Sequence, residues 1–225
     1  IWSGHRVSAK RRRRSKTASS ETPTVNCSKK SASAIMLPES GPASGARSTV
    51  PVVAVRPGSR LDSGTTVASM ELVGAQVLVT GGSKGIGAAL ARAYASAGAH
   101  VLVAARASDE LRAVAAEVGG YAVVIDLTDA DAVEALVPVV EADYGPIDVL
   151  VNNAGMETTD MAAVIDPAVV RATTRLNLEA PMVLTRYALP GMLARGRGHL
   201  VFLSSIAGTA GFPTMATYSA TKAGI

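Results

Sequence analysis

Short apolar runs alternate with longer alanine-rich segments along residues 70–225, and this alternation predicts parallel strands with helices between them. The runs are almost free of charge, as expected for strands that helices cover on both faces. Right-handed crossovers between such units give an α/β fold with a doubly wound parallel sheet. We predict strands at 77–80, 100–105, 121–125, 147–151 and 199–204, and helices near 85–97, 108–117, 128–143 and 167–194, the last with Pro181 inside it.

Residues 1–69 differ from the rest of the 225-residue chain in charge and composition. They hold 12 lysines and arginines against three acidic residues, a net charge of +9, whereas residues 70–225 carry a net charge of −5. Ser, Pro and Gly are frequent, a basic run occupies residues 10–16, and no helical or strand period is sustained. We therefore expect residues 1–69 to be a disordered basic tail and residues 70–225 to form the folded domain.

Three interpretations of the basic tail remain open. It could lie outside the mature protein, because the chain begins at Ile1 and Met70 directly precedes the first ordered pattern. Its arginine- and serine-rich, acid-poor composition also fits an organelle transit peptide. A nucleic-acid-binding arm is the third interpretation, and its binding would weaken steeply with salt. We expect no nucleic-acid partner for the folded domain itself.

Composition excludes several classes of protein. With 48% hydrophobic and 18% charged residues the chain is too apolar to be wholly disordered, and no uninterrupted apolar stretch is long enough to cross a bilayer. The single cysteine, Cys27, has no partner for an internal disulfide, and the three histidines have no metal-ligand spacing. We therefore expect a cytoplasmic protein without a bound metal, with organelle import through the tail as the alternative.

A glycine-rich turn joins the first predicted strand to the first predicted helix. Thr80, Gly81, Gly85 and Gly87 form the pattern T-G-x-x-x-G-x-G, which lets backbone N–H groups and a helix N-terminus approach a pyrophosphate. The same turn also matches G-x-S-x-G, the nucleophile elbow of α/β-hydrolases, with Ser83 as the nucleophile.

The hydrolase alternative needs a histidine beside Ser83. His100 and His199 are the two histidines that follow it, and both open predicted strands. They would therefore lie at the opposite edge of the sheet, which disfavours a catalytic triad.

A second group of residues has the chemistry of proton transfer. Tyr218 and Lys222 are four residues apart and thus share one helical face, where a cation favours the ionised form of a phenol. Ser205 lies 13 residues before Tyr218, at the end of a predicted strand, and Asn177 lies in the preceding helix. Together with the glycine turn and the run 152–155 (N-N-A-G), this set resembles the classical type of the short-chain dehydrogenase/reductase (SDR) family over about 150 residues.

The resemblance implies a Rossmann fold and hydride transfer between NADP(H) and a carbonyl compound or secondary alcohol. Tyr218 would be the general acid or base, and Lys222 would favour its ionised form and hold the nicotinamide ribose. Ser205 would stabilise charge on the substrate oxygen, and Asn177 would hold a water that links Lys222 to solvent. The cofactor-binding residues implied are Gly81, Ser83, Lys84, Gly85, Ile86, Gly87, Arg106, Asp126, Leu127, Asn153, Ala154 and Gly155, with Tyr218 and Lys222.

The residue after the second strand predicts the cofactor. In the family that this chain resembles, an acid there binds the ribose of NAD, whereas a base receives the 2′-phosphate of NADP. Arg106 holds this place, and Lys84 in the glycine turn adds a second cation. We therefore expect NADP(H) to be favoured over NAD(H).

The substrate is expected to be a small carbonyl compound or alcohol, bordered by Met156 and by residues 209–215, where Phe212, Pro213 and Met215 are apolar. Residues 209–215 also fit a plain mobile loop. The chain stops at Ile225 within an expected helix, so we expect the fold to be truncated there, and a homodimer or homotetramer for the full-length protein. A catalytically inert nucleotide-binding sensor or scaffold is the alternative function.

Overall fold

Six parallel strands form one sheet in the order β1-β4-β3-β2-β5-β6. The structure is a computed structural model that describes residues 24–26 and 70–225. From the central strand β2 the chain adds strands first on one side and then on the other, which is the doubly wound arrangement of a Rossmann fold and confirms the predicted fold class. The strands expected from the sequence are β2 (Gln76–Thr80), β3 (His100–Ala105), β4 (Tyr121–Val124), β5 (Val149–Asn152) and β6 (His199–Phe202).

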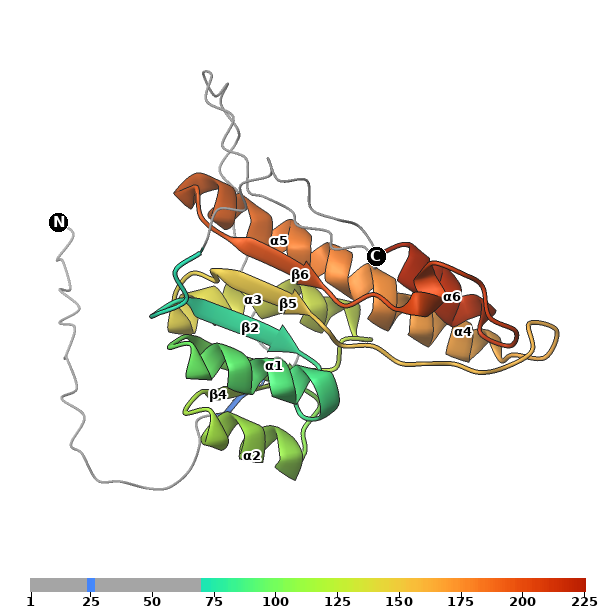
Figure 1. Cartoon of the computed structure of the whole chain (residues 1–225), viewed down its shortest axis with the longest axis horizontal. Coiled ribbons are helices and arrows are strands. Elements are labelled where there is room, and N and C mark those ends of the chain that lie inside the picture. Colours follow the sequence, from blue (N-terminus) through green and yellow to red (C-terminus); the bar gives the residue numbers. More distant parts are fainter. Residues whose placement is uncertain (1–23, 27–69) are drawn as a thin grey trace, which may run out of the picture.

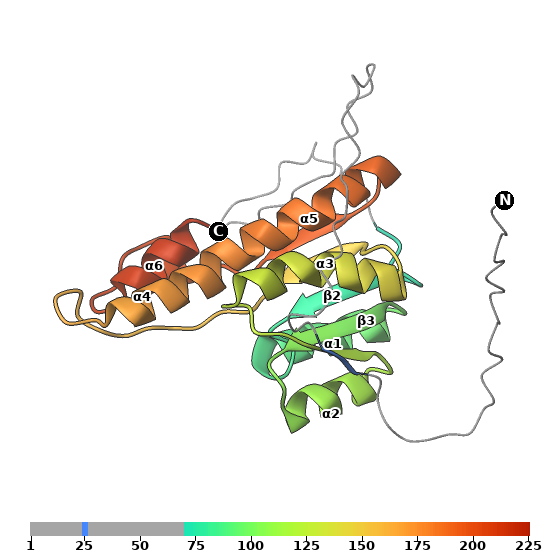
Figure 2. The ribbon, with the colours of Figure 1, turned by 180° about the vertical axis from the view of Figure 1, so that it is seen from behind.

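Helices cover both faces of the sheet (Figures 1 and 2). The longest have 15 and 16 residues, and within the described residues no helix is both long and apolar enough to cross a membrane. The helical elements are α1 (Gly85–Ser96), α2 (Asp109–Glu117), α3 (Ala130–Tyr144), α4 (Pro167–Thr174), the π-helical turn η1 (Arg175–Glu179), α5 (Ala180–Arg195), the 3-10 turn η2 (Ile206–Gly208) and α6 (Ala216–Ala223).

The two faces of the sheet bury different side chains. On β2, Val77 and Val79 pack with α1 and α2, whereas Leu78 points the other way and packs with α3 and α5. All three side chains are fully buried. Because successive side chains of a strand point to opposite faces, a strand with helices on both sides must be apolar at every position. This explains the uninterrupted apolar runs of the sequence.

One short strand lies in a segment that the sequence pattern did not mark as a strand. Thr24–Asn26 forms β1, which pairs in parallel with β4 at the edge of the sheet. The expectation of no regular structure in residues 1–69 was therefore wrong for these three residues. The outer edge of β4 offers unpaired backbone N–H and C=O groups, and any short extended segment can pair with them without a periodic pattern of its own. The remainder of residues 1–69 lies outside the described residues.

The single helix expected over 167–194 is divided by the π-helical turn η1. Within it the N–H of Ala180 donates to the carbonyl of Arg175, five residues back. Pro181 has no N–H to donate to the carbonyl of Asn177, four residues back, so the α-helical pattern is interrupted beside it. Asn177 is buried in this turn, and the irregularity therefore lies where the sequence places a functional residue.

Candidate active site

Every predicted site residue except those on helices follows the carboxyl end of a strand. Thr80 pairs with Ala104, Ala105 with Val124, and Asn152 with Phe202, so the loops after these strands meet at one edge of the sheet. The elements α4 and α6 lie beyond this edge (Figure 1). Parallel α/β sheets bind ligands at this edge.

The glycine turn after β2 brings the backbone very close to α1. Gly81 and Gly85 have φ values of 65° and 56°, in the left-handed region that favours glycine. A Cβ on Gly87 would lie only 2.3 Å from the carbonyl oxygen of Gly81, whereas a Cβ on Gly85 would meet no heavy atom within 4 Å. The turn is therefore tightly packed against the protein at Gly87, whereas there is free space next to Gly85.

The N-terminus of α1 is free of protein caps. Side chains of Ser108, Asp129 and Asp166 accept N–H groups at the starts of α2, α3 and α4. At α1 the capping position is Lys84, whose side chain makes no capping hydrogen bond, and the first turn carries no acid. The first N–H groups of a helix need an acceptor, and they favour an anion. The turn thus has the backbone features expected of a pyrophosphate site, and pyrophosphate binding there stays a prediction.

The side chains of buried Thr80 and half-buried Asn153 join the glycine turn to the loop after β5. The Thr80 hydroxyl donates to the carbonyl of Val151 and accepts the N–H groups of Asn153 and Ala154, each at 3.1 Å. Asn153 Nδ2 donates to the carbonyls of Thr80 (2.8 Å) and Gly81 (3.2 Å). Asn153 is predicted to contact the cofactor, and in the structure its side chain stabilises the shape of the glycine turn. The motif includes Thr80 but does not indicate that its hydroxyl joins the two loops.

The cations expected at the cofactor site are exposed at the turns after β2 and β3. Hydrogen bonds from the Thr128 N–H and hydroxyl lower the pKa of Asp126, and the positive charge of Arg106 lowers it further. The pKa of Glu110 is lowered mainly by the hydrogen bonds that its carboxylate accepts from its own N–H and from Ser108. The positive charge of Lys84 also lowers this pKa, by a smaller amount. The positive charge of Arg106 thus stabilises the carboxylate of Asp126. Both residues follow the carboxyl ends of neighbouring strands, β3 and β4, as predicted.

Tyr218 and Lys222 lie on α6, as the spacing predicted. The Lys222 Nζ is 5.9 Å from the centroid of the Tyr218 ring, and it donates to the carbonyl of Leu203 at 2.7 Å. Lys222 is only 7% exposed, and this burial lowers its pKa. The hydrogen bond to Leu203 compensates part of the cost of holding an ammonium group there.

Asn177 connects α6 to the loop after β5. Its Oδ1 accepts the Met156 N–H at 2.9 Å, while Nδ2 donates to the Met156 carbonyl (2.9 Å) and to the Thr221 Oγ1 (3.1 Å). A Cβ on Gly155 would lie 3.3 Å from Asn177 Oδ1 and 3.4 Å from Lys222 Nζ. Gly155 therefore leaves room for both polar groups. The water that Asn177 was expected to hold stays a prediction.

Ser205 caps the short turn η2. Its Oγ accepts the N–H of Ala207 at 3.2 Å, which leaves the hydroxyl hydrogen available for another acceptor. The neighbouring Ser204, to which the sequence assigned no function, donates to the carbonyl of Lys222 at 2.7 Å. Thr221, also missed, donates to the carbonyl of Tyr218 at 2.8 Å. Both residues position α6, and no sequence motif distinguishes them from ordinary polar residues.

The hydrolase alternative is not supported by the geometry. Ser83 follows the carboxyl end of β2, whereas His100 and His199 are the first residues of β3 and β6, at the other edge. A serine nucleophile needs its histidine within hydrogen-bond reach. Among the described residues, no group of three His, Cys, Asp or Glu side chains could hold a metal ion.

Comparison with known proteins decides the family. The family model for short chain dehydrogenases matches residues 75–225. The chain belongs to the short-chain dehydrogenase/reductase family. Within it, the SDR chain is 40% identical over 159 residues to the ketoacyl reductase HetN of a Nostoc species, covering 68% of this chain and 55% of that protein. It is 37% identical over 164 residues to a short chain dehydrogenase of Pseudocercospora fijiensis, covering 69% of this chain and 52% of that protein.

A solved SDR structure has the same fold. The crystal structure of a metagenomic short-chain oxidoreductase in complex with NADP superposes with a TM-score of 0.65 and 42% identity, covering 69% of this chain and 72% of that chain. The SDR chain spans about half the length of the curated relatives named above.

The glycine turn can be tested by a pair of alanine substitutions. Gly87→Ala should lower the free energy of unfolding by about 3 kcal/mol or more, because the new Cβ overlaps the Gly81 carbonyl and Asn153 Nδ2. Gly119→Ala, at a φ of 61° with no atom within 4 Å of the added Cβ, should cost only about 1 kcal/mol. Urea unfolding of the natural protein measures both losses, and equal losses would contradict the close approach at Gly87.

The connection between Asn177 and α6 can be tested at Thr221. Thr221→Val keeps the volume but removes an acceptor of Asn177 Nδ2, and it should lower the free energy of unfolding by about 1 to 3 kcal/mol. Thr217→Val, on the same helix and only half-buried, is the matched control and should change the urea midpoint little. If the two variants unfold at the same midpoint, the Thr221 hydroxyl does not stabilise the site.

Proposed function

We propose that the natural protein containing this chain transfers a hydride between NADP(H) and a carbonyl compound or its secondary alcohol, with Tyr218 as the general acid and base. One observation carries the proposal: the polar groups of Asn177 and Lys222 meet at Gly155, with Tyr218 on the same helix as Lys222. This cluster follows β5 and β6, at the same edge of the sheet as the uncapped N-terminus of α1. Family membership and the reductase and dehydrogenase names of the relatives support the same reaction type.

Each side chain has a defined part in the reduction. The nicotinamide, when bound, supplies the hydride. The Tyr218 hydroxyl donates its proton to the substrate oxygen, and the Ser205 hydroxyl donates a hydrogen bond to the same oxygen as negative charge develops there. The positive charge of Lys222 stabilises the phenolate that Tyr218 becomes. In the oxidation of an alcohol, Tyr218 takes the proton instead.

Lys222 has hydrogen-bonding capacity left for the cofactor. An ammonium group has three N–H donors, and the Leu203 carbonyl takes one of them. The other two can serve the hydroxyls of the nicotinamide ribose next to Gly155, which itself has no side chain. Burial of Lys222 also excludes water from this position and strengthens each of these contacts.

The preference for NADP(H) rests on charge. Arg106 and Lys84 are exposed cations at the two turns that flank the uncapped helix N-terminus, where the adenosine half of a dinucleotide would extend. Guanidinium groups bind phosphate oxygens well, so Arg106 suits the 2′-phosphate. The metagenomic relative was crystallised with NADP, which agrees with this preference. Homodimer or homotetramer formation and a cytoplasmic location stay predictions.

The acid–base role is tested by removing one hydroxyl. Tyr218→Phe in the natural protein should lower kcat for carbonyl reduction by about 100-fold or more, with the dissociation constant of NADPH nearly unchanged. Tyr187→Phe, which removes an exposed hydroxyl on α5 that contacts Glu134, is the control and should keep full activity. Retained turnover in Tyr218→Phe would refute the assignment. Tight NADPH binding by the unmodified protein without turnover of any carbonyl would instead favour a sensor or scaffold.

The cofactor preference is tested by reversing one charge. Arg106→Asp should shift the ratio of kcat/KM for NADPH over NADH towards NADH by about 10- to 100-fold, because a hydrogen-bonded charge contributes about 1.5 to 3 kcal/mol. Arg112→Asp makes the same charge change beside it on α2, where the native guanidinium is paired with Asp109. A shift of equal size in both variants would show a general field effect, and no shift in Arg106→Asp would refute the role of Arg106.

A further inference from the structure

We propose that the site selects carbonyl substrates whose non-reacting part is uncharged and apolar. This inference rests on the proposed function and adds the substrate class to it. It comes from two loops next to Tyr218: residues 156–166, between β5 and α4, and residues 205–215, between β6 and α6. We refer to them as the β5 loop and the β6 loop.

The two loops lie side by side and are joined to the reacting residues. The N–H of Asp160 in the β5 loop donates to the carbonyl of Thr214 in the β6 loop at 2.8 Å. The β5 loop begins at Met156, which both accepts from and donates to the Asn177 side chain. The β6 loop ends at Met215, whose carbonyl accepts the N–H of Ser219, the residue after Tyr218. A substrate held at Tyr218 would therefore lie next to both loops.

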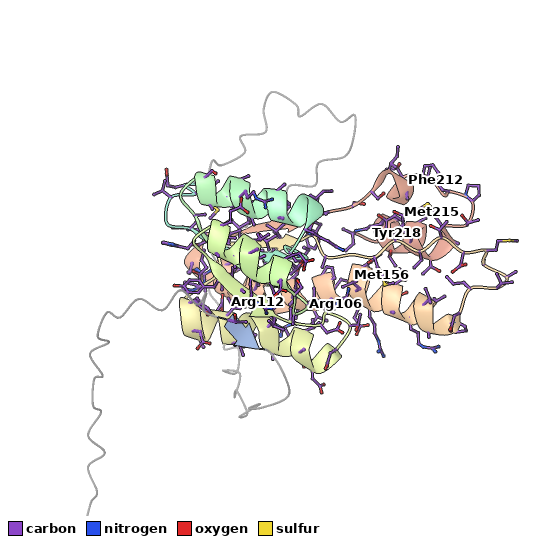
Figure 3. All side chains as sticks on the ribbon, turned by 90° about the horizontal axis from the view of Figure 1, so that it is seen from below. Arg106, Arg112, Met156, Phe212, Met215 and Tyr218 are labelled. Atoms are coloured by element: carbon purple, nitrogen blue, oxygen red, sulfur yellow. The ribbon has the colours of Figure 1, made fainter. Side chains whose placement is uncertain are left out.

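Large apolar side chains of both loops are exposed. Ile206 is 71% exposed, Met161 63% and Phe212 41%, while Met156 and Met215 are half-buried. Figure 3 shows Met156, Met215 and Phe212 near Tyr218, at the end of the molecule that carries α4 and α6. Exposed apolar area of this kind favours contact with a hydrocarbon group, at about 25 cal/mol per Å² removed from water.

The charges of the two loops exclude anions. The β6 loop has no charged residue, and the β5 loop has the carboxylates of Glu157, Asp160 and Asp166 but no lysine or arginine. Lys222, on the same helix as Tyr218, is buried and donates a hydrogen bond to the Leu203 carbonyl. A substrate with a carboxylate or phosphate would meet like charges here and lose its hydration without a partner.

An unusual backbone conformation lies at the point where the two loops are hydrogen-bonded to each other. Thr214 has a φ of 66°, the one positive value among the non-glycine residues that the structure describes. A β-branched residue is rarely found in this region, and the conformation costs free energy. It turns the Thr214 carbonyl towards the N–H of Asp160. The two loops are thus joined through their backbones next to the helix that carries Tyr218.

Two ketones that differ at one end test the proposal. In the natural full-length protein, NADPH oxidation is followed with 2-octanone and with 7-oxooctanoate, which replaces the terminal methyl group of 2-octanone by a carboxylate. We expect kcat/KM to be about 10-fold or more higher for 2-octanone, since an unpaired charge in an apolar site is strongly rejected. The double substitution Glu157→Gln and Asp160→Asn should narrow this difference by improving the value for 7-oxooctanoate.

Substitutions in the two loops test whether their apolar side chains bind the hydrocarbon part of the substrate. Phe212→Ala should raise KM for 2-octanone several-fold and leave the dissociation constant of NADPH unchanged. Val73→Ala, at an exposed apolar residue before β2, is the matched control and should change neither value. Met161→Ala replaces Phe212→Ala if that variant fails to fold.

The outcomes separate the inference from the proposed function. Equal or better turnover of 7-oxooctanoate, or turnover of polar and charged carbonyls alone, would overturn the apolar substrate class while leaving the hydride-transfer function in place. An unchanged KM for 2-octanone in both loop variants would also overturn it. Failure to turn over any carbonyl, with NADPH bound, would refute the proposed function, and the inference would fall with it.

Discussion

The hydrogen bonds between Thr80 and Asn153 hold the site together, because they join loops that are more than 70 residues apart in the chain. Four of the seven residues of the glycine turn, Gly81, Gly82, Gly85 and Gly87, have no side chain that could stabilise it. Its shape depends on the amide of Asn153, which donates to two of its carbonyls. A Cβ on Gly81 would lie 2.8 Å from the Ala154 Cα, so the two loops are in direct contact. The first N–H groups of α1 have no side-chain cap, and the hydrogen-bonded turn holds them in the geometry of an anion-binding site.

A second set of hydrogen bonds joins the loop after β5 to α6. Asn177 binds the backbone of Met156 in the loop after β5, and through Thr221 it is joined to the helix of Tyr218. Ser204 fastens the same helix to the loop after β6. The proposed catalytic residues on α6 are thus positioned by neighbours to which no catalytic role is assigned. The π-helical turn around Asn177 is where the long helix departs from regular geometry, and a buried amide there can satisfy backbone groups of another loop.

Charge divides the carboxyl edge of the sheet into two parts. The exposed cations Lys84 and Arg106 follow β2 and β3, whereas the loops after β5 and β6 carry carboxylates or no charge at all. Lys222 is buried and hydrogen-bonded, and burial lowers its pKa. In the proposed reaction, the anionic cofactor would bind near the cations and the uncharged substrate near the other loops, so the two would not compete for the same groups.

Local patterns in the sequence were enough to predict the succession of strands and helices from β2 onward, the glycine turn, and the placement of Tyr218 and Lys222 on one helix. Each of these depends on local periodicity or on a spacing of a few residues. Family membership was also readable from the motifs. The contacts between distant parts of the chain became visible in the folded structure alone. They are the hydrogen bonds from Asn153 to the glycine turn, those of Asn177 with Met156 and Thr221, and the bond between the β5 and β6 loops. The folded structure also shows that Thr24–Asn26 pairs with β4, which no local pattern marked. Hydrogen bonds between residues far apart in sequence leave no period in it, since any polar residue brought to the right place can form them.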